Sequence, residues 1–271
     1  TGRIKEITQP RGGYIRPTEF KTIQISDNKI LGEENIHASI IGMVVDYLTR
    51  FIMAKCTTSK ERERTILEKA FEISIKGYEL RVKLFGEKVL KEDKKQKVDL
   101  DSLLNLINGL DNDSIIAACK LTTYDVWYRN PMSAIMAKPA IEINPDEQTI
   151  ENIRIMINRC IDFWKNYGPI KVDGFTFEKD GYTKTVNAGD GDFLTADTLW
   201  DFKVTNSKLT NKHTLQLLMY WIMGQHSKKP EFKNITKLGI FNPRLNIVYI
   251  YDIKCLSKEI IKDIEDNVIC Y

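Results

Sequence analysis

The spacing of apolar residues changes along the chain, and this change predicts a helical first part and a β-rich last part. From residue 34 to residue 55, apolar side chains recur every three or four positions, which is the period of one face of a helix. The same period continues over 59–85 and, in shorter stretches, over 99–167. From Gly174 onward the period falls to two, which is typical of strands.

One strongly apolar helix interrupts the β-rich part. It is apolar on nearly all sides, so we expect it to be buried. Strands are expected on both sides of it, and a final helix is expected near the end of the sequence. The expected elements are strands at 175–177 and 183–186, a hairpin over 189–203, the apolar helix at 211–225, strands at 237–241 and 247–251, and a helix at 257–268.

The predicted hairpin brings acidic residues to one face of the sheet. Side chains alternate between faces along a strand, so Asp201 and Lys203 share one face and apolar side chains occupy the other. A loop of two or four residues would put Asp192 directly opposite Asp201, with Cβ atoms about 4.5–5.5 Å apart. A loop of three residues without a bulge would send the two acids to opposite faces. The expectation therefore depends on the register of the hairpin.

Asp192 and Asp201 are candidate metal ligands. Two carboxylates at this distance repel each other unless a proton or a cation lies between them. Mg²⁺ prefers oxygen ligands and typically takes one or two carboxylates together with waters and substrate phosphates. Lys203 would position or deprotonate an attacking water, or stabilise a charged transition state; a plain ion pair with Asp192 or Asp201 is the alternative. Asp190 would share the same face and is a further candidate ligand.

These residues belong to a longer pattern of Gly-x-x-Asp, then Asp-x-Lys, then Gln-x-x-x-Tyr on a helix. Its positions are Gly189 and Asp192, Asp201 and Lys203, and Gln216 and Tyr220. The pattern resembles the PD-(D/E)xK nuclease superfamily, and within it the RecB-like and lambda-exonuclease-like branch. The superfamily's nominal Pro is absent, and Gly191 stands before the acid. The resemblance implies an α/β fold, with a restriction-endonuclease-like α-β-β-β-α-β core and a helical insertion.

The resemblance also implies roles for individual residues. The implied catalytic residues are Asp192, Asp201, Lys203, Gln216 and Tyr220, and the implied metal ligands are Asp46, Asp192 and Asp201, with Mg²⁺ as cofactor and Mn²⁺ as its substitute. Asp46 follows Gly42 on a helix at the spacing where the branch carries a His or Glu ligand. An ion pair with Arg50, one turn further on, is the alternative for Asp46. Gln216 and Tyr220 would orient the Asp/Lys strand or the nucleic acid, and a buried Gln216 without a partner would cost about 1–3 kcal/mol.

The pattern divides the chain into four segments. They are an extended basic N-terminal arm (1–33), the first core helix (34–58), the helical insertion (59–167), and the sheet and helices of the nuclease core (168–271). A solvated surface segment is the alternative for the arm. The charge-dense stretch from 86 to 97 is expected to be a mobile loop. Candidate phosphate-contacting residues lie in the arm and before the Gln/Tyr helix: Arg11, Arg16, Lys208, Lys212 and, at the start of that helix, His213.

Composition changes this picture little. The 271 residues are 42% hydrophobic and 28% charged, as in an ordinary globular protein, and the net charge of +3 permits nucleic-acid binding without demanding it. Five cysteines without C-x-x-C spacing are expected to be free thiols in a reducing cytosol rather than ligands of an iron–sulfur cluster. No signal peptide and no apolar run of about 18 residues is visible, so no membrane association is expected.

The leading expectation is a metal-dependent nuclease that hydrolyses phosphodiester bonds in DNA and leaves a 5′-phosphate, in the cytoplasm of a bacterial or phage-infected cell. One alternative is a nucleic-acid-binding or assembly subunit that keeps the nuclease fold but is catalytically silent. Another is an interaction protein whose helical insertion binds a protein partner or a second copy. The pattern does not distinguish an exonuclease from an endonuclease.

Overall fold

The computed structural model describes residues 2–25, 27–178 and 180–271, and the chain divides into two compact units. The first, here called the α/β unit, consists of residues 1–28 and 162–271. The second, the helical unit, consists of residues 29–161. The helical unit is therefore inserted in the sequence between the two parts of the α/β unit.

The α/β unit is built on a six-stranded mixed sheet with strand order β1-β6-β5-β4-β3-β2. The strands are β1 (Lys21–Gln24), β2 (Val172–Thr176), β3 (Asp190–Leu194), β4 (Thr198–Phe202), β5 (Lys237–Asn242) and β6 (Ile247–Asp252). β4 and β5 run parallel, and every other neighbouring pair is antiparallel. The protein is thus a mixed α/β structure.

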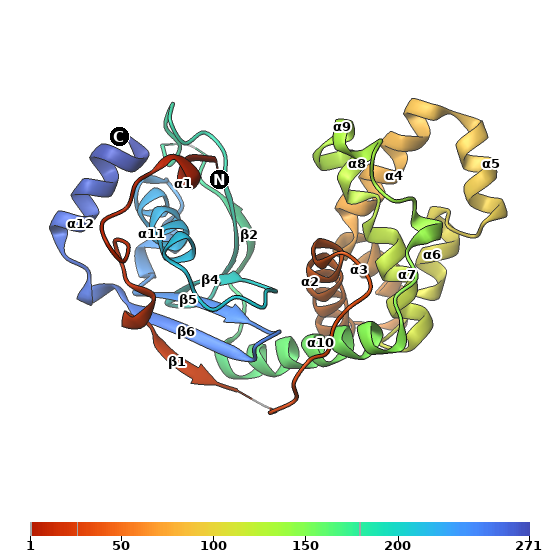
Figure 1. Cartoon of the computed structure of the whole chain (residues 1–271), viewed down its shortest axis with the longest axis horizontal. Helices are drawn as coiled ribbons and strands as arrows, with labels where there is room; N and C mark the ends of the chain where they lie inside the picture. The colour runs from red at the N-terminus through yellow and green to blue at the C-terminus, as the bar shows by residue number, and fades with distance from the viewer. Residues whose placement is uncertain (1, 26, 179) are drawn as a thin grey trace. The chain divides into compact units, whose positions relative to one another are not determined.

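Helix α11 (Asn211–His226) lies across one face of the sheet, with α1 (Gly2–Glu6) and α12 (Lys258–Asp263) beside it (Figure 1). Its apolar side chains, among them Leu215 and Leu218, share a buried core with Leu199 of β4. A π-helical turn, Ile264–Ile269, extends α12 and contributes three further core residues. As expected from its composition, α11 is therefore buried along most of its length.

The C-terminal end of α10 (Glu147–Tyr167) covers the opposite face of the sheet. Phe163 stacks on Phe241 at 4.3 Å between ring centroids and meets Trp200 edge-on at 4.8 Å. Trp164 stacks on Phe202. Trp200 and Phe202 of β4 consequently point toward α10, and Leu199 and Asp201 lie on the face of β4 that points toward α11.

The helical unit is formed by short helices and the first part of α10. They are α2 (Ala38–Lys55), α3 (Glu63–Ala70), α4 (Glu72–Phe85), α5 (Glu87–Lys95), α6 (Leu100–Leu106), α7 (Asn112–Thr122), α8 (Asp125–Arg129) and α9 (Pro131–Ala134). Short 3-10 turns link the elements of both units, at Pro17–Glu19, Lys60–Arg62, Ala140–Glu142, Pro230–Asn234 and Ile253–Cys255. Asp99 and Asp111 cap α6 and α7 by accepting backbone N–H groups of Ser102 and Ser114.

Several local expectations from the sequence are wrong. The charge-dense stretch over 86–97 contains the helix α5 rather than a loop, because Asp93 is buried and paired with Arg81 of α4. Residues 183–186 form no strand; Val186 N–H donates to Thr183 Oγ1 in a local turn instead. The expected single helix over 59–85 is divided between Ala70 and Glu72.

The N-terminal arm and the first helix also differ from expectation. Residues of segment 1–33 are folded into the α/β unit, since Ile4, Ile15 and Phe20 are buried there and β1 pairs with β6. The helix expected in segment 34–58 exists as α2 but belongs to the helical unit. In the α/β unit the helix that precedes β2 and packs on the sheet is the end of α10.

Across the described ranges, every helix is either too short or too polar to span a lipid bilayer.

Candidate active site

The hairpin of β3 and β4 has the register that puts its two acidic residues face to face. Phe193 lies opposite Trp200 and Leu194 opposite Leu199. Thr195 N–H donates to Thr198 O at 3.0 Å, so the loop contains two residues. The same register carried one step further sets Asp192 across from Asp201, on the face that α11 covers.

Asp201 and Lys203 form an ion pair on this face. Lys203 Nζ lies 2.8 Å from Asp201 Oδ2 and 3.1 Å from Oδ1. Only the Oδ1 contact has the geometry of a hydrogen bond, and Oδ2 is buried without any hydrogen bond from the described residues. Oδ2 therefore interacts with Lys203 only through charge, and its lone pairs can accept a further electrophilic partner.

The carboxylate of Asp192 is anchored across the hairpin. Its Oδ2 accepts the backbone N–H of Phe202 at 2.8 Å, which fixes the side chain beside the end of β4. Asp190, two residues earlier, is exposed at the start of β3. Three acidic side chains thus occupy alternate positions of β3 and the facing position of β4.

Tyr220 and Gln216 of α11 face these acids. Gln216 Nε2 donates a hydrogen bond of 2.9 Å to Tyr220 Oη, so the half-buried amide has the partner that its burial requires. Burial raises the pKa of the Tyr220 hydroxyl above its ordinary value; the Gln216 hydrogen bond opposes this, and the nearby charges of Asp201, Asp190 and Asp192 raise it further. The hydroxyl consequently stays protonated at neutral pH and can donate toward the acidic residues.

The N-terminal segment runs along the first turn of α11, which sequence reasoning missed. Gln9 Nε2 donates to Asn211 O at 3.1 Å, and Thr214 Oγ1 donates to Ile15 O at 2.8 Å. Gly13 adopts φ +96°, and a Cβ there would lie 2.7 Å from the Cβ of Asn211. Such an approach needs a residue without a side chain, and the pair Gly12-Gly13 was the available signal in the sequence.

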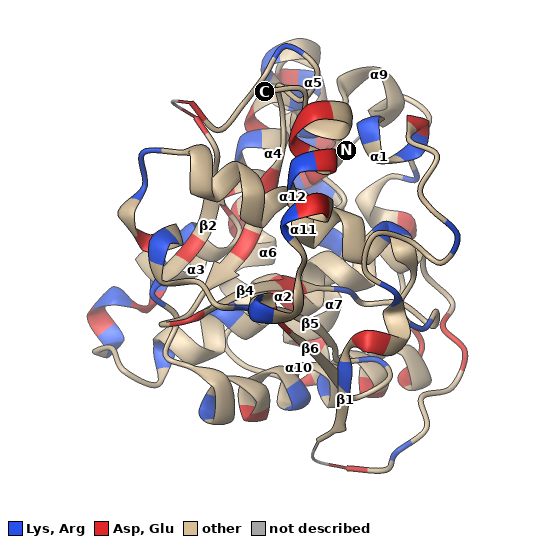
Figure 2. Cartoon of the chain, turned by 90° about the vertical axis from the view of Figure 1, so that its left-hand side faces the viewer, with Lys and Arg blue, Asp and Glu red and all other residues tan. Residues whose placement is uncertain are grey.

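This contact between the N-terminal segment and the first turn of α11, here called the tether, brings basic side chains together at one end of α11. Of the five residues predicted to contact phosphates, His213 is half-buried and the other four are exposed; they are Arg11, Arg16, Lys208 and Lys212. On α12, in contrast, basic and acidic residues alternate (Figure 2). The N-terminal end of α11 is therefore better suited to an anionic ligand than the surface of α12.

Asp46 lies on α2 in the helical unit. Its Oδ1 accepts a hydrogen bond of 2.8 Å from Arg50 Nε, which is the alternative that its sequence position left open. Among the described residues no three His, Cys, Asp or Glu side chains stand together in a way that could hold a metal ion. A metal on the acidic residues of the α/β unit would accordingly need water or substrate oxygens to complete its ligand set.

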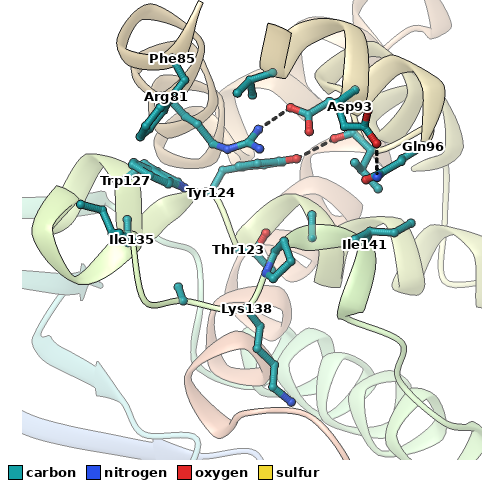
Figure 3. Close-up of a pocket in the computed structure, with 17 residues that line it drawn as sticks. Arg81, Phe85, Asp93, Gln96, Thr123, Tyr124, Trp127, Ile135, Lys138 and Ile141 are labelled. Atoms are coloured by element: carbon teal, nitrogen blue, oxygen red, sulfur yellow. Dashed lines mark hydrogen bonds and ion pairs between the residues drawn. The ribbon is translucent and has the colours of Figure 1, made fainter.

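The helical unit contains a separate cavity of about 500 Å³ (Figure 3). The buried Asp93 and its partner Arg81 lie in its wall, and the Arg81 guanidinium stands 5.6 Å from the centre of the Tyr124 ring. Tyr124 Oη donates to Val98 O at 2.8 Å. Arg81, Asp93 and Tyr124 thus have partners within this wall. The residues that line the cavity include none of those predicted for the active site.

No protein-family model matches this sequence, and no curated protein or solved structure shows a significant match to it.

Proposed function

We propose that the α/β unit carries the active site of a metal-dependent nuclease that hydrolyses phosphodiester bonds in DNA and leaves 5′-phosphates. The observation that carries the proposal is the hairpin, where Asp192 stands across from Asp201 and Lys203 is bonded to Asp201. The proposal is supported by the element order β2, β3, β4, α11 and β5, because it agrees with the β-β-β-α-β part of the core that the sequence resemblance implies. The similarity rests on this arrangement together with the sequence pattern.

The acidic residues fit a hard divalent cation. Asp201 Oδ2 is a buried carboxylate oxygen that accepts no hydrogen bond from the described residues, and the backbone N–H of Phe202 holds the Asp192 carboxylate beside the end of β4. Mg²⁺ typically takes one or two carboxylates, with waters and substrate phosphates as its other ligands. In this proposal Asp192 and Asp201 hold the cation, and Asp190 is a further candidate. A bound cation would supply Lewis-acid neutralisation of the phosphate and activation of water.

The remaining residues supply charge and orientation. Lys203 brings a positive charge beside the acidic residues, where it can stabilise the developing negative charge of the phosphate or position the attacking water. Burial keeps Tyr220 protonated, and Gln216 donates a hydrogen bond to it. In this proposal the two side chains orient the face of α11 that meets β3 and β4. Arg11, Arg16, Lys208 and Lys212 would contact the phosphates on either side of the reacting one.

The test is incubation with linear duplex, circular duplex and single-stranded DNA and with RNA, each in Mg²⁺, Mn²⁺ or EDTA. We expect metal-dependent cleavage of DNA by the wild type and a loss of about 100-fold or more in Asp201→Asn. Asp252→Asn is the matched control, because Asp252 at the end of β6 also pairs with a lysine two residues on, Lys254, and its side chain is 36% exposed. Cleavage retained by Asp201→Asn would contradict the proposal. Binding without cleavage by the wild type would favour a silent binding subunit, and neither binding nor cleavage would favour an interaction protein.

A further inference from the structure

His213 occupies an unusual position at the start of α11. It is the third residue of the helix, and its backbone N–H bonds to the Oγ1 of the capping Thr210 at 3.5 Å. In return, His213 Nδ1 accepts the backbone N–H of Thr210 at 3.4 Å. This reciprocal arrangement is a capping box, in which Glu or Gln normally supplies the second acceptor.

The capping box determines which ring nitrogen carries the proton. A backbone N–H can only donate, so Nδ1 must be the unprotonated nitrogen of a neutral ring. The proton of the neutral imidazole then lies on Nε2. Within the described part of the chain, Nε2 donates to no other group, so this donor is available to a ligand.

The ring lies on the face of α11 that meets the acidic residues. His213 precedes Gln216 by three positions and Tyr220 by seven, which places the three side chains along one stripe of the helix. Burial lowers the pKa of His213, the Lys203 charge lowers it further, and the Asp201 charge opposes this. Both members of the Lys203–Asp201 pair thus act on the ring, and the ring is neutral at pH 7.

We propose that His213 is a substrate-contacting residue of this site, which uses its Nε2–H to donate a hydrogen bond to a non-bridging oxygen of the phosphate at the reaction centre. The inference rests on the proposed nuclease function. A neutral donor suits this place because a second full cation beside Lys203 would be repelled. The positive end of the α11 dipole also favours an anion at this point. The role goes beyond that of Lys208 and Lys212, which reach the phosphates as exposed point charges.

Two substitutions separate the donor from the cap. His213→Asn keeps an acceptor near the Nδ1 position for Thr210 N–H but has no donor at the Nε2 position. His213→Gln keeps the residue type that capping boxes normally use and carries an amide N–H near the Nε2 position. Thr210→Ala weakens the same cap without touching the imidazole, so it reports the effect of the cap alone.

The experiment measures cleavage of linear duplex DNA in Mn²⁺, binding of the same DNA in Ca²⁺, and the melting temperature of each variant. We expect His213→Asn to lower kcat/KM by about 10- to 100-fold, the range for a lost hydrogen bond to a charged group, and to weaken binding in Ca²⁺. We expect His213→Gln to stay within about threefold of the wild type, and Thr210→Ala to lower the melting temperature with little loss of kcat/KM.

Losses in His213→Asn and His213→Gln that equal the loss in Thr210→Ala would overturn the inference, because the role would then be capping only. Wild-type rate and affinity in His213→Asn would overturn it too, while leaving the nuclease proposal standing. If the wild type cleaves no substrate, the nuclease proposal fails separately, and the affinities in Ca²⁺ decide: equal affinities of wild type and His213→Asn contradict the phosphate contact.

Discussion

Lys203 Nζ lies 2.8 Å from Asp201 Oδ2, and the carboxylate of this pair is only 5% exposed while the lysine is 25% exposed. The other Asp-x-Lys ion pair described, between Asp252 and Lys254, has nearly the same length, 2.9 Å, but its carboxylate is 36% exposed and its lysine 80% exposed. Burial of the carboxylate therefore separates the two pairs. A buried carboxylate needs a counter-charge, and Lys203 supplies it here in the way that a metal ion would.

Replacing Lys203 should consequently cost stability as well as activity. We expect Lys203→Met to lower the free energy of unfolding by about 1–3 kcal/mol in EDTA, because it leaves the Asp201 carboxylate buried without a counter-charge. Addition of Mn²⁺ should restore part of this loss, since the cation replaces the missing charge. Denaturant unfolding followed by circular dichroism measures both effects.

The control for this prediction is Lys254→Met, in the exposed pair. Surface ion pairs contribute only about 0–1 kcal/mol, so its effect should be small and independent of Mn²⁺. Equal losses in Lys203→Met and Lys254→Met would show that burial of Asp201 does not matter in the way described.

Gly13 should be indispensable to the tether between the N-terminal segment and α11. We expect Gly13→Ala to lower the free energy of unfolding by about 1–3 kcal/mol, because the residue has φ +96° and its Cβ would stand 2.7 Å from the Cβ of Asn211. It should also weaken nucleic-acid binding, since Arg11 and Arg16 are carried by the displaced segment. Thermal melting and fluorescence anisotropy measure the two effects.

Gly2→Ala is the matched control in the same part of the chain. A Cβ at Gly2 would have no atom within 4 Å, so the free energy of unfolding of this variant should lie within about 0.5 kcal/mol of the wild-type value. If Gly13→Ala behaves like Gly2→Ala, the close approach to Asn211 is not a constraint on the fold.

The basic side chains around the start of α11 should determine the salt dependence of nucleic-acid binding. Each substitution that removes one phosphate contact should reduce the slope of log K against log salt by about 0.7–0.9. The substitutions to compare are Arg11→Ala, Arg16→Ala, Lys208→Ala and Lys212→Ala. Binding isotherms at several salt concentrations in Ca²⁺ give this slope. Lys258→Ala and Lys262→Ala on α12, where charges of both signs alternate, should leave the slope unchanged. A slope that responds equally to both groups would place the nucleic acid elsewhere.

The sequence was sufficient for the elements whose signals are local. The period of two around Asp192 and Asp201 predicted the hairpin but left its loop length open, and the structure has the two-residue loop that puts the two acids on one face. The continuous apolar run over 211–225 predicted α11, which spans Asn211–His226. In both cases the residues that define the element lie close together in the chain.

The errors arose where contacts between distant residues decide the structure. Helix α5 looked like a solvated loop, because its charged residues gave no sign that Asp93 would be buried against Arg81. The arm looked extended, because the partner of β1 is β6, more than 200 positions later. Whether Asp46 serves as a third metal ligand stays a prediction, since its spacing after Gly42 is its main support and its carboxylate is bonded to Arg50.

The most direct test of the account compares Lys203→Ala with the wild type on linear duplex DNA in Mn²⁺, at a temperature where both are folded by circular dichroism. We expect Lys203→Ala to lose about 100-fold or more of the cleavage rate while it still binds DNA in Ca²⁺, because the carboxylates and the basic residues at α11 remain. Equal cleavage rates of the two proteins would contradict the proposed role of Lys203 and the active site built around it.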